Sequence, residues 1–202
     1  MKILIISGTP KSDGLCHSLV TAAAEAAFTK GVETEVVKLS DFNLQRCKMC
    51  GDGWGSCYKQ HRCAFGDEDG FNSLQDKYRD ADAFVYITPV YLAEVSEVMN
   101  CFLNKLRRCQ APKLWNNNPE KSYQTDKPTI FAASAGGGGG GIAHTFLQME
   151  QAVAHMGGLT WQWGGVYDYI AVNRWNQDYK REALKAAVVS MINGYKNGSL
   201  YD

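Results

Sequence analysis

The chain has 202 residues, with 21 basic and 21 acidic side chains and therefore a formal net charge of zero. This length is that of one ordinary domain, so we expect a single domain over residues 1–202. The lack of a basic excess argues against nucleic acid or an anionic membrane as a partner. No apolar run reaches the length of a membrane span and no signal peptide is recognisable, so we expect a cytoplasmic protein.

The first segment combines a strand, a polar loop and a helix. Residues 2–7 are apolar on both faces, which predicts a strand inside a parallel sheet. The loop offers the hydroxyls of Ser7, Thr9 and Ser12, and the helix that begins near Leu15 adds unpaired N–H groups that favour an anion. The loop lacks the triphosphate and dinucleotide glycine motifs, so it suits a monophosphate better. The alternative is an ordinary strand-to-helix turn.

The second segment has the same layout. Residues 83–88 predict a strand, Thr88-Pro89-Val90-Tyr91 follows it, and residues 95–109 carry apolar side chains at helical spacing. The end of a parallel strand is where doubly wound folds bind ligands. Tyr91 is the best candidate for contact with a flat ring, and its alternative role is that of a buried aromatic at a strand end.

With both segments in view, the sequence resembles the flavodoxin-like NADPH-dependent FMN reductase family, including its iron-sulfur flavoprotein branch. In that family a Gly-Ser-Pro-Arg-like loop holds the FMN phosphate, and a Ser/Thr-Pro-x-Tyr loop lies against the isoalloxazine. The matching stretches here are Gly8-Thr9-Pro10-Lys11 and Thr88-Pro89-Val90-Tyr91. Ser134 and the glycines at 136–141 fit the third flavin loop, although a flexible turn is the alternative for these glycines.

The chain departs from the family pattern in the phosphate loop. Lys11 replaces the usual Arg, and Leu15-Cys16 stands where Asn-Thr is common, so we expect one hydroxyl contact to the phosphate to pass to Ser12, His17 or Ser18. The residues that the resemblance implies for cofactor binding are Ser7, Thr9, Pro10, Lys11, Ser12, Cys16, His17, Ser18, Thr88, Pro89, Val90, Tyr91, Ser134, Ala135, Gly136, Gly137 and Gly138.

The implied fold is a flavodoxin-like α/β three-layer sandwich, with helices on both faces of a five-stranded parallel sheet in the order 2-1-3-4-5. The alternation of apolar segments agrees with it. We expect strands at residues 2–7, 33–39, 83–88, 128–134 and 160–166. We expect helices at about 15–30, 71–80, 95–109, 142–156 and 178–194, and a surface loop at 110–127.

A cysteine-rich insertion at about residues 41–70 interrupts this alternation. Cys47, Cys50, Cys57 and Cys63 lie within it, and thiols this dense in a cytosolic chain suggest metal binding or redox chemistry. The iron-sulfur branch carries a Cys-x2-Cys-x2-Cys motif with a fourth cysteine soon after, whereas here the second gap is six residues. An iron-sulfur cluster, a structural zinc, and free or reversibly oxidised thiols therefore all stay open.

Other polar and sulfur side chains near the insertion receive structural interpretations. We expect His61 to be an exposed loop histidine and the acidic residues 67–69 to begin a helix. Cys101 and Cys109 would lie about 12 Å apart along one helix, too far to form a disulfide. We expect both to be buried against the sheet.

The predicted function is that of an FMN-dependent oxidoreductase, which takes hydride from NAD(P)H and reduces a quinone, a free flavin or another small acceptor. The alternative is an iron-sulfur flavoprotein that exchanges electrons with a ferredoxin-like partner, and a third interpretation is a flavin-free interaction module. No residue beyond the flavin loops is predicted to be catalytic, and nothing selects NADH over NADPH.

The family also implies a homodimer or homotetramer. Aromatic residues crowd the C-terminal third and could lie at such an interface or pack beneath the last helix: Trp161, Trp163, Tyr167, Tyr169 and Trp175.

Overall fold

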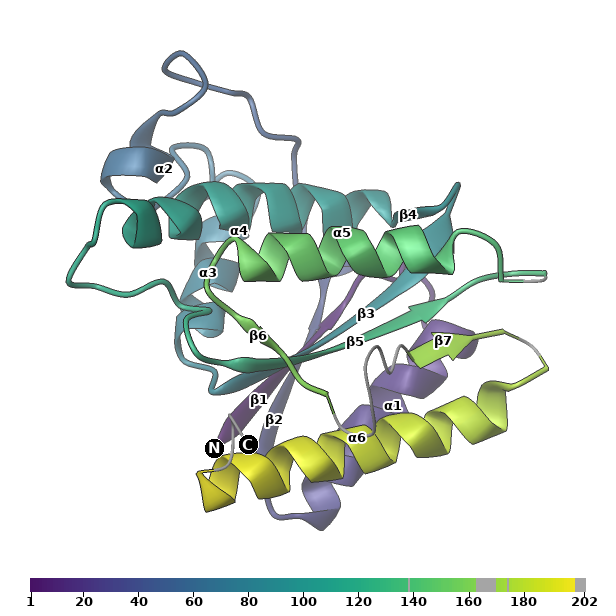
Figure 1. Ribbon diagram of the computed structural model, residues 1–202. Coiled ribbons are helices and arrows are strands. Elements are labelled where there is room, and N and C mark those ends of the chain that lie inside the picture. Colours follow the sequence, from purple (N-terminus) through teal and green to yellow (C-terminus); the bar gives the residue numbers. More distant parts are fainter. Residues whose placement is uncertain (138, 163–169, 174, 199–202) are drawn as a thin grey trace.

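A computed structural model describes residues 1–137, 139–162, 170–173 and 175–198 of the chain (Figure 1). One sheet forms the middle layer, and its strands follow the order β2-β1-β3-β5-β6. The parallel strands are β1 (Lys2–Ser7), β2 (Glu33–Lys38), β3 (Ala83–Tyr91), β5 (Pro128–Ser134), β6 (Leu159–Thr160) and β7 (Ile170–Val172). This is the predicted flavodoxin-like order.

Helices cover both faces of the sheet (Figure 1). Those of the described part are α1 (Leu15–Thr29), the 3-10 turn η1 (Leu39–Asp41), α2 (Ser56–Lys59), α3 (Phe71–Arg79), α4 (Glu97–Trp115), α5 (Ile142–Ala154) and α6 (Gln177–Asn197). Helices α3, α4 and α5 lie on one face, α1 and α6 on the other, and α2 stands outside the layers within the insertion (Figure 1). None of these helices is long and apolar enough to cross a membrane.

The two faces of β3 explain the two apolar cores, because successive strand residues point to opposite sides of a sheet. Phe84 and Tyr86 pack toward α3 and α4, and the Tyr78 ring stacks on Phe84 with ring centroids 4.0 Å apart. Val85 and Ile87 pack toward α1 and α6. The hydroxyls of Tyr78 and Tyr86 are hydrogen-bonded at 2.7 Å, so these buried polar groups satisfy each other.

The third predicted strand was too short. β3 continues through Thr88-Pro89-Val90-Tyr91 and pairs antiparallel with β4 (Glu94–Val95), so the expected loop is one arm of a hairpin. Leu92 and Ala93 form its tip with positive φ angles of 51° and 67°. The helix expected from residue 95 therefore begins at Glu97, after the hairpin.

The predicted surface loop at 110–127 was partly wrong. α4 runs on to Trp115 and contains Pro112, and residues 110–113 are buried. Gln110 accepts a hydrogen bond from the Tyr123 backbone at 2.9 Å, which packs the returning chain against the end of the helix. Tertiary packing therefore outweighs the helix-breaking tendency of proline at this position.

The fifth predicted strand is divided. β6 pairs with the start of β5 and β7 with its end, while residues 163–166 of the expected strand lie outside the described residues.

Among the C-terminal aromatics, Trp161 packs on α6, where its ring lies 2.2 Å from the position that a Cβ at Gly194 would take. Trp163, Tyr167 and Tyr169 lie outside the described residues.

Candidate functional site

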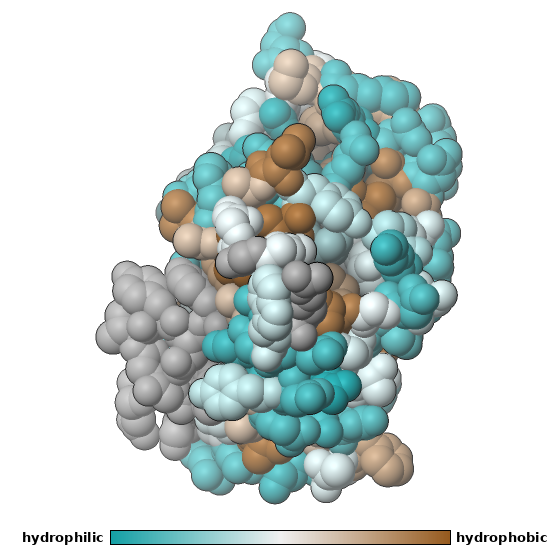
Figure 2. Space-filling view, turned by 90° about the vertical axis from the view of Figure 1, so that its right-hand side faces the viewer, coloured by the Kyte–Doolittle hydropathy of each residue, from teal (hydrophilic) through white to brown (hydrophobic). Residues whose placement is uncertain are grey.

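The three predicted flavin loops meet at one edge of the sheet, where β1, β3 and β5 end. The strand register places Ser7 beside Ile87 and Pro89 beside Ser134, and Gly8 donates its N–H to the Ile87 carbonyl at 2.8 Å. Figure 2 looks onto this edge, and apolar surface gathers in patches in the upper half of the view. Segments up to about 130 residues apart in sequence thus form one site.

The first loop presents both hydroxyls and free backbone donors. Ser7 and Thr9 are buried, whereas Pro10, Lys11 and Ser12 are exposed. Thr9 Oγ1 accepts a hydrogen bond from the Lys11 backbone at 3.3 Å. α1 follows Gly14 without a side-chain cap, so no capping side chain competes with an anion for its first N–H groups.

Two residues of α1 that the sequence predicted to bind the cofactor, Ser18 and Cys16, make hydrogen bonds within the protein instead. Ser18 Oγ donates to the Leu15 carbonyl at 2.7 Å, one turn back along the helix. Burial raises the pKa of Cys16 to about 11, and hydrogen bonds with Ser134 partly oppose this rise. Cys16 therefore stays a neutral thiol near pH 7 and connects the start of α1 to the end of β5.

The second loop is positioned by Ser96, a residue that the sequence analysis did not select. Ser96 Oγ donates to the Gly8 carbonyl at 2.7 Å and accepts a hydrogen bond from the Met99 backbone at 3.4 Å. Its own backbone N–H bonds Thr88 Oγ1 at 3.1 Å. The sequence signal was a serine directly before a helix that starts with glutamate, which is a common N-cap pattern.

The third loop lies against the hairpin tip. Ala135 donates its N–H to the Val172 carbonyl at 3.0 Å, and Gly136 and Gly137 are exposed beyond it. Gly141 has φ 84°, and a Cβ there would lie 2.4 Å from the Cα of Ala93. Glycine is therefore required at this contact. Gly138 lies outside the described residues.

A groove of about 650 Å³ runs from the second loop toward the insertion. Tyr91 and the fully exposed Leu92 line one end, and Cys47 and Met49 line the other. Asn100 and Asn104 of α4 also line it. Its volume is in the range of small-molecule sites, and its lining combines apolar side chains and two amides with four charged side chains, those of Arg46, Glu94, Glu97 and Arg108.

The four cysteines predicted as metal ligands surround one small cavity. Cys47, Cys50, Cys57 and Cys63 all line it, together with the cations Lys105 and Arg108. Backbone hydrogen bonds from Gly55 and Phe65 reach the sulfurs of Cys57 and Cys63, while burial raises the pKa of both thiols. Sulfur atoms that accept backbone hydrogen bonds and lie beside cations are suited to be metal-bound thiolates. Within the described ranges, however, no three His, Cys, Asp or Glu side chains are already arranged to hold a metal ion.

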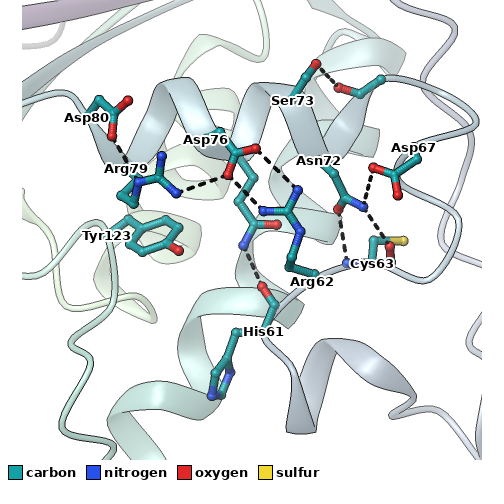
Figure 3. Close-up of polar contacts among 12 residues, drawn as sticks. His61, Arg62, Cys63, Asp67, Asn72, Ser73, Asp76, Arg79, Asp80 and Tyr123 are labelled. Carbon is teal, nitrogen blue, oxygen red and sulfur yellow. Dashed lines mark hydrogen bonds and ion pairs between the residues drawn. The ribbon is translucent and has the colours of Figure 1, made fainter.

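A polar network holds the insertion to α3 (Figure 3). Arg62 makes two hydrogen bonds to Asp76, at 2.8 and 3.3 Å. Asn72 receives the Cys63 N–H at 3.3 Å and donates to the Cys63 carbonyl at 3.1 Å. A Cβ at Gly66 would lie 2.3 Å from Asn72 Oδ1, so this glycine leaves room for the amide. The main chain around Cys63 is thus fixed by side chains of α3.

One prediction near the insertion is wrong, and two others give only part of what the structure shows. His61 is buried rather than exposed, and its Nε2 bonds Asn118 Nδ2 at 2.9 Å. Asp69 lies before α3, where its Oδ1 accepts the Phe71 N–H at 3.1 Å, but its carboxylate also forms a buried ion pair with Lys105. Cys109 is fully buried as expected, yet it lines the cysteine cavity. These contacts join residues far apart in sequence, so spacing could not reveal them.

Comparison with known proteins finds a family model and several relatives that are similar in sequence. The family model for NADPH-dependent FMN reductase matches residues 1–167. An iron-sulfur flavoprotein of Methanosarcina thermophila is 27% identical over 176 residues, which are 80% of this chain and 83% of that protein. The iron-sulfur flavoprotein MJ1083 of Methanocaldococcus jannaschii is 30% identical over 107 residues, about half of each chain at 53% and 52%.

A solved structure matches the whole chain. The crystal structure of RosB with a bound 8-demethyl-8-formylriboflavin-5'-phosphate intermediate has a TM-score of 0.71 and 17% sequence identity, covering 100% of this chain and 82% of that one. At this identity the likeness establishes the flavodoxin-like fold.

Proposed function

Because the chain belongs to the NADPH-dependent FMN reductase family, we propose that it binds FMN at the edge where β1, β3 and β5 end, and that it reduces a small organic acceptor with NAD(P)H. Flavin oxidoreductase function and the cofactors FMN and NADPH fit this family. The observation that supports the proposed site is the meeting of the three loops, the first two of which Ser96 links by hydrogen bonds to Gly8 and Thr88.

Each loop has a separate role in this proposal. Thr9, Ser12 and the first N–H groups of α1 hold the phosphate, with Lys11 at the rim. Tyr91, half-exposed at the end of β3, lies against the ring. Backbone N–H groups of the third loop beyond Ala135, whose own N–H bonds the Val172 carbonyl, stabilise negative charge on the ring by fixed dipoles. Bound FMN would supply hydride acceptance and electron transfer, so no side-chain acid or base is needed.

The groove beside Tyr91 is the proposed acceptor site. Its apolar lining by Leu92, Val95 and Met49 suits a flat ring, and the amides of Asn100 and Asn104 suit carbonyl oxygens. A quinone or a free flavin has both features. The acceptor would thus be recognised by shape and hydrogen bonding, beside the charged side chains of Arg46, Arg108, Glu94 and Glu97 that also line the groove.

FMN uptake and NADPH consumption test this proposal directly. Protein stripped of flavin should quench the fluorescence of added FMN with one site per chain, and the loaded protein should consume NADPH faster when a quinone is present. The variant Tyr91→Ala should raise the KM for the quinone, whereas Trp115→Ala, an exposed aromatic outside the groove, should not. Protein that takes up no FMN would refute the proposal.

The alternative is an iron-sulfur flavoprotein that passes electrons to a ferredoxin-like protein. The cysteines around one cavity and the names of the relatives support it. An absorption spectrum of anaerobically purified protein separates the two functions. Broad absorption beneath the flavin bands, with slow bleaching by NADPH, would favour the carrier. We also propose that the protein forms a homodimer or homotetramer, as the family implies. Light scattering of the FMN-loaded protein would measure its molar mass and so the number of chains.

A further inference from the structure

A second groove, the α4–α5 groove, adjoins the proposed acceptor groove. Its two helices lie side by side on one face of the sheet (Figure 1). The α4–α5 groove has a volume of about 440 Å³ and shares Val95, Asn100 and Asn104 with the groove at Tyr91. A long ligand with one end at Tyr91 can therefore reach along α4 into the second groove.

The lining of the α4–α5 groove is rich in hydrogen-bond donors and contains basic side chains. Its amides and basic residues are Asn100, Asn104, Gln148, Gln151, Arg107 and His155. Among the described residues that line it none is acidic, whereas Glu94 and Glu97 line the groove at Tyr91. Charged donors without a carboxylate beside them favour an anionic ligand.

Arg107 differs from the other two arginines of these grooves. Arg46 pairs with Glu97 at 2.8 Å, and Arg108 donates to the Gly53 carbonyl. No hydrogen bond or ion pair joins Arg107 to any residue that the structure describes. Burial and the Arg108 charge lower the pKa of Arg107, as expected for a half-buried cation that lacks a neighbouring carboxylate. An anionic ligand would supply the missing charge.

The position of Arg107 shows which kind of anion the groove suits. Asn100, Asn104 and Arg107 follow the i, i+4, i+7 spacing of one helix face, so Arg107 lies about 10 Å along the axis from Asn100. Arg107 is in the middle of α4 and His155 follows the last residue of α5, so neither lies at a helix N-terminus, where backbone N–H groups bind a pyrophosphate. Side chains alone would hold the anion, and a guanidinium binds two phosphate oxygens at once.

We propose that the α4–α5 groove binds the 2′-phosphate of NADPH, with Arg107 on the phosphate, His155 beside it and the nicotinamide at Tyr91. This inference rests on the proposed function, because it concerns the hydride donor of that reaction. NADH lacks the 2′-phosphate and gains nothing from Arg107, so this residue selects NADPH over NADH. The nicotinamide and the acceptor use the Tyr91 end in turn.

Anaerobic reduction of the bound flavin, without an acceptor, measures the affinity for each donor. The FMN-loaded wild type should have a lower apparent Kd for NADPH than for NADH. Arg107→Gln should raise the Kd for NADPH about tenfold or more, against little change for NADH, because a charged hydrogen bond is lost. Arg107→Lys keeps the charge without the paired donors and should lie between them. Arg181→Gln, on α6 at the other face of the sheet, is the control and should match the wild type.

Binding of two adenosine nucleotides tests the groove without any hydride transfer. Calorimetry of the protein as purified should detect adenosine 2′,5′-bisphosphate and show much weaker binding of adenosine 5′-monophosphate. Arg107→Gln should remove this difference. Arg107 has no bond to the described chain, so we expect the variant to fold, and its thermal unfolding would verify this.

Two results would overturn the proposal. Equal loss of NADPH and NADH affinity in Arg107→Gln would assign the groove to the pyrophosphate that both donors carry. Unchanged NADPH affinity in that variant would show that Arg107 contacts no part of the donor. Failure of the proposed function is a separate result: FMN-loaded protein that neither donor reduces would refute the reductase, while selective binding of the bisphosphate would still support the phosphate site.

Discussion

At the proposed flavin edge, where β1, β3 and β5 end, the candidate groups stand at the ends of regular strands, whereas in the cysteine-rich insertion they stand on turns and on the short helix α2, next to α3 and α4. Ser7, Pro89 and Ser134 are set by strand register. The insertion instead depends on side chains from distant elements, such as Asn72, Asp76 and Lys105. The insertion is thus held by polar contacts together with apolar side chains such as Leu44 and Cys57 that join the core, while the proposed flavin edge is set by strand pairing.

The largest expected effect is in the insertion. Lys105 and Asp69 are both 3% exposed and form an ion pair, so Lys105→Met leaves a buried carboxylate without its counter-charge. Loss of one partner of a buried pair typically costs about 3–5 kcal/mol. Chemical denaturation should show this loss. Lys48→Met is the control, because Lys48 pairs with Glu68 at 3.9 Å on the surface and should change stability by less than about 0.5 kcal/mol.

A smaller loss is expected at the flavin edge from Gly141→Ala. The residue has φ 84°, and the new Cβ would meet the backbone of Ala93, so we expect a cost of about 2–4 kcal/mol. The displaced hairpin tip should also weaken FMN binding, measured by fluorescence titration. Gly140→Ala is the matched control in the same run, since nothing lies within 4 Å of its Cβ position. Equal behaviour of the two variants would contradict the role of this contact.

Ser96→Ala tests the link between the first two loops. It removes a donor to the Gly8 carbonyl and an N-cap of α4, and should cost about 1–2 kcal/mol. Because Gly8 belongs to the phosphate loop, FMN affinity should fall as well. Ser73→Ala removes a comparable bond from Oγ to the Gly70 carbonyl at 2.8 Å, but far from the flavin edge. It should lower stability slightly and leave FMN affinity unchanged.

The smallest effect concerns pH and the Arg62–Asp76 pair. The Arg62 guanidinium holds the pKa of Asp76 below its usual value. Such a carboxylate stabilises the fold above the pKa of a free Asp, near about 4, and the gain is lost as pH falls through the lower folded pKa. Both side chains are about two-fifths exposed, so screening keeps the effect below about 1 kcal/mol.

Denaturation of Arg62→Gln at pH 7 and below pH 4 measures this contribution. The difference from the wild type should be present at pH 7 and should shrink in acid. Arg181→Gln, which breaks the exposed pair with Asp178, is the comparison and should show little change at either pH. A stability difference that persists unchanged in acid would show that Arg62 acts through packing alone.

Apolar periodicity and strand-end motifs are local signals, and they predicted alternating strands and helices of a parallel sheet. The resemblance to the family supplied the sheet order, which the structure confirms, and the three loops proposed to bind flavin. The position of Ser96 was also within reach as an N-cap signal. The sequence analysis missed that β3 continues into a hairpin, whose Val95 N–H bonds Gln148 of α5, and that α4 continues past Pro112, where Gln110 accepts a hydrogen bond from the Tyr123 backbone.

Only the tertiary structure decided what surrounds the cysteines. The insertion motif indicated four thiols, but Cys109, Lys105 and Arg108 reach the same cavity from α4, about 40 to 60 residues later in the chain. Likewise His61, predicted to be exposed, is buried because Asn118 reaches its ring. Spacing along the sequence shows which side chains of a single helix, strand or loop can lie close together. Which elements face one another depends on how the helices pack on the sheet.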